Sequence, residues 1–222
     1  SADKSSSAWL TSSIGGITVS AADTSPGSGL AFAKYRWDNS VVADGTLFTS
    51  GSSITIVSEG AHTLTIQSTD TAGNTSTLWQ GTYKQDTVAP IASASQSLAA
   101  WRTASVVPVL SGTDASPGSG LSTLRYRWDN TVVDSGTLAS SGDSVTIPGD
   151  RSHTLYVKAT DAAGNGTVWS GSYNLDRQAP IVSADKSGSG WWTTAIGNIT
   201  LAVSEPAPGS GLALSRYRWD NP

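Results

Sequence analysis

Apolar and polar residues alternate with a period of two in several short segments of the chain. In residues 17–21, Ile17, Val19 and Ala21 alternate with Thr18 and Ser20. Because successive side chains of a strand point to opposite faces, this period predicts half-buried β-strands. The same alternation occurs in residues 34–38, 53–56, 63–68 and 79–83.

Turn-forming residues separate the alternating segments. Pro26-Gly27, Glu59-Gly60 and Ala72-Gly73-Asn74 fall between them, where the chain has to reverse. Long tracts of helix-forming residues are absent from the sequence, and no apolar run approaches the roughly 20 residues of a membrane-spanning helix. The pattern therefore predicts an all-β chain, with no membrane insertion in this segment.

The sequence repeats itself with a period of 91 residues. Tyr-Arg-Trp-Asp-Asn at 35–39 returns at 126–130 and again at 217–221. Ser-Pro-Gly-Ser-Gly-Leu at 25–30 returns at 116–121, and returns with Ala in place of the first Ser at 207–212. A Thr-Asp-x-Ala-Gly-Asn motif occurs at 69–74 and 160–165. Three independent motifs with one period indicate repeated structural units.

The length of the period indicates the kind of unit. It is close to the roughly 100 residues of one immunoglobulin-like sandwich and far longer than the roughly 20–45 residues of a solenoid turn. We therefore expect tandem immunoglobulin-like (Greek-key) β-sandwich domains in an extended rod. The expected domains are repeat 1 at residues 1–91, repeat 2 at 92–181, and a partial repeat 3 at 182–222 with roughly strands A to C. We expect Pro222 to be a boundary inside a longer protein.

Several of these motifs resemble a known group of modules. The stretch from Ile147 to Asn165 is similar to the E–F turn, strand F and F–G turn of fibronectin type III and bacterial Ig-like repeats, and so is the Asp-x-x-Ala-Pro sequence at Asp86–Pro90 and Asp176–Pro180. The resemblance implies non-catalytic spacers in adhesins, surface filaments or other secreted proteins. It also implies an extracellular or cell-surface location.

Composition narrows the set of partners. The net charge is −4, so the chain lacks the basic surface that nucleic acids require. Cysteine is absent, which excludes disulfides and thiolate metal sites. The expected partners are the neighbouring repeats of the same chain, with self-assembly or a host or glycan surface as further partners.

The candidate catalytic groups do not form a recognisable active site in the sequence. Each complete unit has a single histidine, His62 or His153, at the position where the fibronectin-type pattern has a corner tyrosine. We expect each imidazole to bond back to the E–F turn, as that tyrosine does. A metal or pH-switch role is the alternative, although histidines in separate domains cannot share an ion. The sequence therefore predicts that the chain is not an enzyme and has no catalytic residues.

Calcium is the one cofactor that the sequence leaves open. The candidate ligands are four aspartates, two at the junctions and two in the F–G turns: Asp70, Asp86, Asp161 and Asp176. Calcium takes about 6–8 oxygen ligands, and only two carboxylates per junction can be placed. The preferred interpretation is that no cofactor binds. Asp70 and Asp161 then cap turns, and Asp86 and Asp176 are solvated linker residues.

The nine tryptophans provide the alternative to a spacer. Alternation places Trp37, Trp128 and Trp219, and also Trp79 and Trp169, in the core. The edge residues that could stack on a sugar are Trp9, Trp101, Trp191 and Trp192. The sequence thus predicts a structural spacer, with a glycan- or protein-binding module or an accessory domain of a secreted hydrolase as alternatives.

Overall fold

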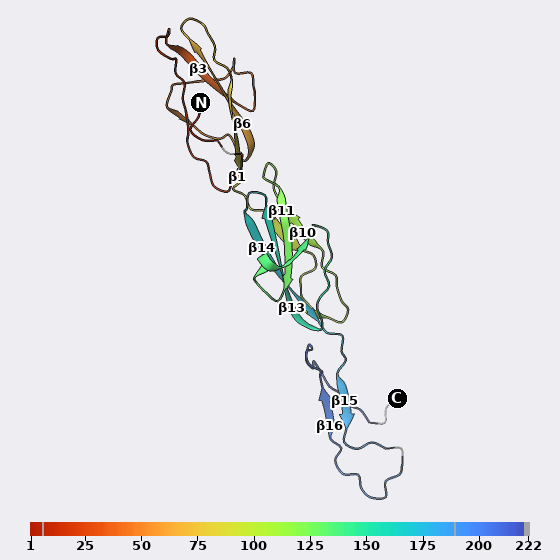
Figure 1. The fold of residues 1–222 in the computed structure, drawn as a ribbon. Helices are drawn as coiled ribbons and strands as arrows, with labels where there is room; N and C mark the ends of the chain where they lie inside the picture. The colour runs from red at the N-terminus through yellow and green to blue at the C-terminus, as the bar shows by residue number, and fades with distance from the viewer. Residues whose placement is uncertain (6, 189, 220–222) are drawn as a thin grey trace. The chain divides into compact units, whose positions relative to one another are not determined.

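The computed structural model describes residues 1–5, 7–188 and 190–219, and its regular structure is almost entirely β (Figure 1). The described residues contain no α-helix, and one 3₁₀ turn, η1, spans Val133–Ser135. This confirms the predicted all-β sandwich class. Asp220 and Asn221 of the third Tyr-Arg-Trp-Asp-Asn motif lie outside the described residues.

The chain divides into two compact units. The first unit consists of Ser1–Ala92 together with Gly112–Leu124 and Lys158–Val168. The second consists of Ser93–Ser111, Arg125–Val157 and Trp169–Pro222. Two segments of predicted repeat 2, each a loop with the strand ends beside it, are thus grouped with the first unit.

Two sheets form the sandwich within Ser1–Ala92. The larger has the order β1 (Trp9–Leu10), β7 (Trp79–Gln85), β6 (Gly60–Asp70), β3 (Leu30–Trp37) and β4 (Thr46–Phe48), and the smaller pairs β2 (Ile17–Val19) with β5 (Ser52–Ile54). Strands β3 and β6 run antiparallel side by side (Figure 1). Each of the five alternating segments contributes to a strand. Alternation did not reveal β1 and β4, which are very short.

The core of this sandwich is built on Tyr83. Ile17, Val19, Leu64 and Tyr83 are fully buried, and the Tyr83 hydroxyl donates a hydrogen bond to the carbonyl of Lys4. Trp37 is half-buried and meets the Tyr83 ring edge to face at 5.3 Å between centroids. The prediction that Trp37 is a core residue is thus only partly right, because the tyrosine occupies the centre and the indole lies at its side.

A glycine makes room for the second tryptophan of this unit. A Cβ on Gly81 would lie 2.5 Å from the Trp79 ring, so the indole can lie over the strand only where no side chain intervenes. Gly171 and Trp169 have the same relation at 2.4 Å. Both tryptophans are half-buried, so the prediction that they lie in the core is only partly right, as it is for Trp37.

The same local structures return further along the chain. A second five-stranded sheet has the order β12 (Thr137–Ala139), β11 (Leu121–Trp128), β13 (Arg151–Asp161), β14 (Gly166–Leu175) and β9 (Leu98–Arg102). Strand β10 (Leu110–Thr113) pairs with β8 (Ile91–Ala94). Tyr173 is fully buried, donates to the Ser95 carbonyl at 2.8 Å, and meets Trp128 at 5.4 Å.

The residues after 181 form a smaller structure. Strand β15 (Ile181–Ala184) pairs antiparallel with β16 (Leu201–Ser204). Residues 211–218 carry no strand, and Trp219 is 68% exposed. The prediction that Trp219 lies in a core is wrong, because none of the described strands pairs with this segment as β6 and β4 pair with β3.

We predict that Tyr83→Ala destabilises residues 1–91 by roughly 3–5 kcal/mol, because it leaves a large cavity in the core. Tyr83→Phe should cost only about 1 kcal/mol, since it removes the hydroxyl contact and keeps the ring. Native-state hydrogen exchange of the β6 and β7 amides measures both effects in the full chain. Equal losses for the two variants would contradict the central position of the ring.

Candidate functional site

The first junction, residues 86–90, is held by a buried aspartate. Asp86 has no exposed surface. Its Oδ2 accepts a hydrogen bond from the Ser119 amide at 2.6 Å, and its Oδ1 accepts from the Val88 amide at 3.1 Å. The Asn165 side chain donates to the Asp86 carbonyl at 2.8 Å. The expectation of a solvated linker residue is therefore wrong for Asp86.

The Pro-Gly-Ser-Gly-Leu loop is shaped to receive this carboxylate. A Cβ on Gly118 would lie 3.1 Å from Asp86 Oδ2 and 2.5 Å from the Ala115 carbonyl, so only glycine allows the close approach. Gly120 has a φ of 85° and donates its amide to Asp114 Oδ2 at 2.7 Å. The repeated motif thus presents the Ser119 amide to the junction.

The second junction, residues 176–180, repeats this contact. Asp176 is 6% exposed, and its Oδ2 accepts from the Ser210 amide at 2.7 Å. Its Oδ1 accepts from the Gln178 amide at 3.1 Å, as Asp86 Oδ1 accepts from Val88. Asp176 was also expected to be solvated, and burial against the glycine loop corrects that expectation too.

A second acid anchors each linker to the repeat that precedes it. Glu59 accepts from the Thr87 amide at 3.0 Å and from the Thr87 hydroxyl at 2.7 Å. Asp150 accepts from Arg177 Nε at 2.7 Å in the equivalent place. The linkers are therefore bonded on both sides. The recurrence of an acid at 59 and 150 was the available sequence signal for this role.

The four calcium candidates separate into two groups. Asp86 and Asp161 come together, joined by Asp114, with one carboxylate oxygen of each within 4.8 Å of the others. This is the one such group among the described residues. Asp70 instead binds its own turn, accepting from the Asn74 amide and side chain at 2.8 Å each. Asp176 lies at the second junction.

The grouped carboxylates offer hard oxygen ligands of the type that calcium prefers. Three carboxylates fall short of its usual 6–8 oxygens, however, and their oxygens already accept from N–H groups. Asp161, for example, accepts from the Gly164 amide at 2.7 Å and from the Asn165 side chain at 2.8 Å. Burial raises the pKa of Asp86, but the hydrogen bonds from Ser119 and Val88 outweigh burial and leave that pKa below its ordinary value. The hydrogen bonds from Ser119 and Val88 therefore favour the ionised form of Asp86.

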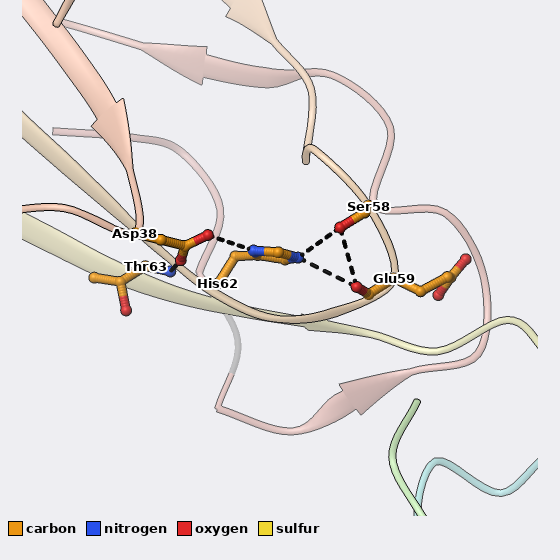
Figure 2. A network of polar contacts seen from close by, with 5 residues as sticks. All are labelled: Asp38, Ser58, Glu59, His62 and Thr63. Atoms are coloured by element: carbon orange, nitrogen blue, oxygen red, sulfur yellow. Dashed lines mark hydrogen bonds and ion pairs between the residues drawn. The ribbon is translucent and has the colours of Figure 1, made fainter. Parts of the chain in front are cut away.

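A separate polar network surrounds His62 (Figure 2). Its Nδ1 lies 2.7 Å from Asp38 Oδ2, and Asp38 Oδ1 accepts from the Thr63 amide at 2.8 Å. Its Nε2 lies 3.2 Å from Ser58 Oγ and 3.3 Å from the Glu59 carbonyl, both in the E–F turn. The predicted bond from the corner histidine to this turn is present, while the aspartate partner was missed.

Ser58, His62 and Asp38 have the connectivity of a hydrolytic triad. Repetition argues against that role. Asp129 and His153 keep the pair at 2.7 Å in the second repeat, but Gly149 replaces the serine. There Arg151 Nε donates to His153 Nε2 at 3.3 Å, which places the imidazole proton on Nδ1, facing Asp129. The retained Asp–His pair ties the end of β3 to β6 in the first repeat and the end of β11 to β13 in the second.

The tryptophans proposed for glycan stacking differ in exposure. Trp9 is half-buried, Trp101 is 40% exposed, Trp192 is 53% exposed and Trp191 is fully exposed. The structure thus leaves three of the four accessible to a ligand.

No protein-family profile matches the chain, and no curated protein matches it. Among solved structures, the chain is similar to the fibronectin(III)-like modules of Clostridium thermocellum CbhA, with 13% identity and a TM-score of 0.32 over 79% of this chain and 94% of that one. No helix in the described residues is long and apolar enough to cross a membrane.

We predict that calcium does not stabilise the first junction, because N–H donors already occupy its carboxylate oxygens. The melting temperature of the full chain should be the same in millimolar calcium and in chelator. A rise with calcium that Asp114→Asn abolishes would instead assign the group to a cation, with the distant Asp44→Asn as the control.

Acid should weaken the Asp–His pairs. Burial raises the pKa of Asp38, but hydrogen bonds from His62 and Thr63 and the nearby His62 charge leave it below its ordinary value. The pKa of Asp129 is also below its ordinary value, because the hydrogen bonds from Thr154 and His153 outweigh the effect of burial. A lowered pKa contributes stability that is present above the unfolded value of about 4 and is lost as the pH falls through the folded value.

We therefore predict that Asp38→Asn costs about 1 kcal/mol at neutral pH and that its difference from the native chain shrinks below about pH 4. Ser58→Ala should have little effect at either pH. Denaturant unfolding monitored by hydrogen exchange in β3 and β6 measures both. A larger loss for Ser58→Ala than for Asp38→Asn would contradict the structural role of the pair.

Proposed function

We propose that this chain is a non-catalytic spacer of immunoglobulin-like repeats in a bacterial surface or secreted protein. The observation that supports it is the same contact at both junctions: Asp86 to the Ser119 amide at 2.6 Å, and Asp176 to the Ser210 amide at 2.7 Å. A feature that recurs at each junction serves the joining of units. A binding site, by contrast, is needed only once.

The linkers support the same role through their restricted conformations. Thr87 donates a hydrogen bond to Glu59, and Asp86 accepts a hydrogen bond from the Ser119 amide of the next repeat. Pro90 and Pro180 fix φ within the same short segments. A linker bonded at both ends loses most of the conformations that let neighbouring domains swing. A spacer that holds its ends at a set separation requires this stiffness.

Breaking both junction contacts should make the full chain more flexible in solution. We predict that Asp86→Ala with Asp176→Ala broadens the distribution of end-to-end distances measured by small-angle scattering, while Asp44→Ala, at an exposed aspartate, leaves it unchanged. An unchanged distribution in the double variant would contradict the proposal. Compact side-by-side repeats in the native chain would favour a clamp around a ligand instead.

A glycan- or protein-binding module is the second candidate, and the exposed indole of Trp101 is the observation in its favour. Exposed aromatic faces suit sugar stacking. Titration of polysaccharides against the native chain and Trp101→Ala distinguishes the candidates. Saturable binding that the substitution abolishes would favour the module over the spacer.

A further inference from the structure

The sequence contains one Asn-Gly dipeptide, Asn165-Gly166, and it lies in the F–G turn of the second repeat. Asparagine is a chemically labile residue. A following glycine makes it more so, because the main-chain nitrogen of a residue without a Cβ can approach the preceding side-chain amide freely. Gly166 is also exposed. The equivalent asparagine of the first repeat, Asn74, is followed by Thr75, whose branched side chain hinders that approach.

Two acceptors hold the side-chain amide of Asn165. Nδ2 donates to Asp161 Oδ2 at 2.8 Å, within the turn, and to the Asp86 carbonyl at 2.8 Å, in the linker. An amide nitrogen carries two hydrogens, so both are engaged. Asn74 donates to Asp70 Oδ2 at 2.8 Å in its own turn, but it is exposed, whereas Asn165 is half-buried. The bond from Asn165 to the linker lasts only while the turn lies against the first junction.

Replacing this amide with a carboxylate would reverse the contact. A carboxylate has no hydrogen to donate, so the bonds to Asp161 and to the Asp86 carbonyl would both be lost. The new charge would stand beside Asp86, Asp114 and Asp161, which already have one oxygen each within 4.8 Å of the others. Like charges at such separations repel one another. Conversion of Asn165 to aspartate should therefore weaken the first junction.

We propose that Asn165 is a deamidation site whose reaction the closed junction slows and whose product keeps the junction open. The Gly166 main-chain nitrogen bonds to Asn165 Cγ, the bond from Cγ to Nδ2 breaks, and Nδ2 leaves as ammonia with the proton that the Gly166 amide gives up. Water then opens the resulting cyclic imide to aspartate or isoaspartate, so the sequence needs no oxidant or reductant.

The junction controls the first of these steps. The hydrogen bonds of Nδ2 to Asp161 and Asp86 must break before the side chain can turn toward the attacking nitrogen and ammonia can leave. The rate should therefore follow the fraction of chains in which the junction is open. This inference rests on the contacts of Asn165 and does not depend on the spacer proposal.

Mass spectrometry of the full chain, aged in mildly alkaline buffer, measures the conversion at each asparagine. We expect slow conversion of Asn165 in the native chain and roughly fivefold faster conversion in Asp86→Ala, the factor that one lost hydrogen bond gives. Asp44→Ala, at an exposed aspartate, should match the native chain. Adding Gly166→Ala to Asp86→Ala should suppress the reaction. The added Cβ would lie 3.3 Å from the Ala159 carbonyl, so a small local shift accommodates it.

The variant Asn165→Asp reproduces one product of the reaction. Its Ser119 amide should exchange with solvent roughly tenfold faster or more than in the native chain, because two junction hydrogen bonds are lost. Asn74→Asp makes the same change in the exposed turn of the first repeat, and should leave the Ser119 amide as slow as in the native chain. Unchanged protection of the β6 and β13 amides shows that the sandwiches of each variant remain folded.

Three results would overturn the proposal. They are equal conversion of Asn165 in the native and Asp86→Ala chains, conversion in denaturant that is no faster at Asn165 than at Asn74, and unchanged exchange of Ser119 in Asn165→Asp. None of them bears on the spacer proposal, because scattering measures the stiffness of the chain separately.

Discussion

A carboxylate removed from water needs hydrogen-bond donors, and Asp86 Oδ2 finds one when the loop at residues 114–120 lies against it. The Ser119 amide supplies the shortest of these bonds at 2.6 Å. Because the donor belongs to the next repeat and the acceptor to the linker, satisfying the charge also fixes the contact. The arrangement at Asp176 and Ser210 follows the same constraint.

Each sandwich depends on a second buried polar group. The hydroxyls of Tyr83 and Tyr173 donate hydrogen bonds to the carbonyls of Lys4 and Ser95. Burial raises the pKa of both hydroxyls to about 12. These hydroxyls therefore stay protonated across the physiological range and can donate to the carbonyls. The Asp–His pairs add a second polar contact to each sandwich, joining the end of β3 to β6 and the end of β11 to β13. The Trp37 ring meets both Tyr83 and His62 edge to face.

Alternation was sufficient to predict β2, β3, β5, β6 and β7 of the first repeat, because one face of each is buried. It failed for Trp219, since burial depends on strands elsewhere in the chain. Of the calcium candidates, Asp86 and Asp161 come close together, and Asp114, which the sequence interpretation did not include, joins them through the folding of the loop. The solvated linker interpretation failed because sequence position says nothing about which amides face a side chain. The recurrence of Asp at 86 and 176, and of Gly at 118 and 209, was the usable signal.

The central claim is that the junction aspartate holds the amide of the following glycine loop. Hydrogen exchange of Ser119, compared with Ser28 at the equivalent position of the first repeat, tests it directly. Ser119 is half-buried and Ser28 is exposed. The account predicts that the Ser119 amide exchanges slowly in the native chain and as fast as Ser28 in Asp86→Ala. Equal exchange of the two amides in the native chain would contradict it.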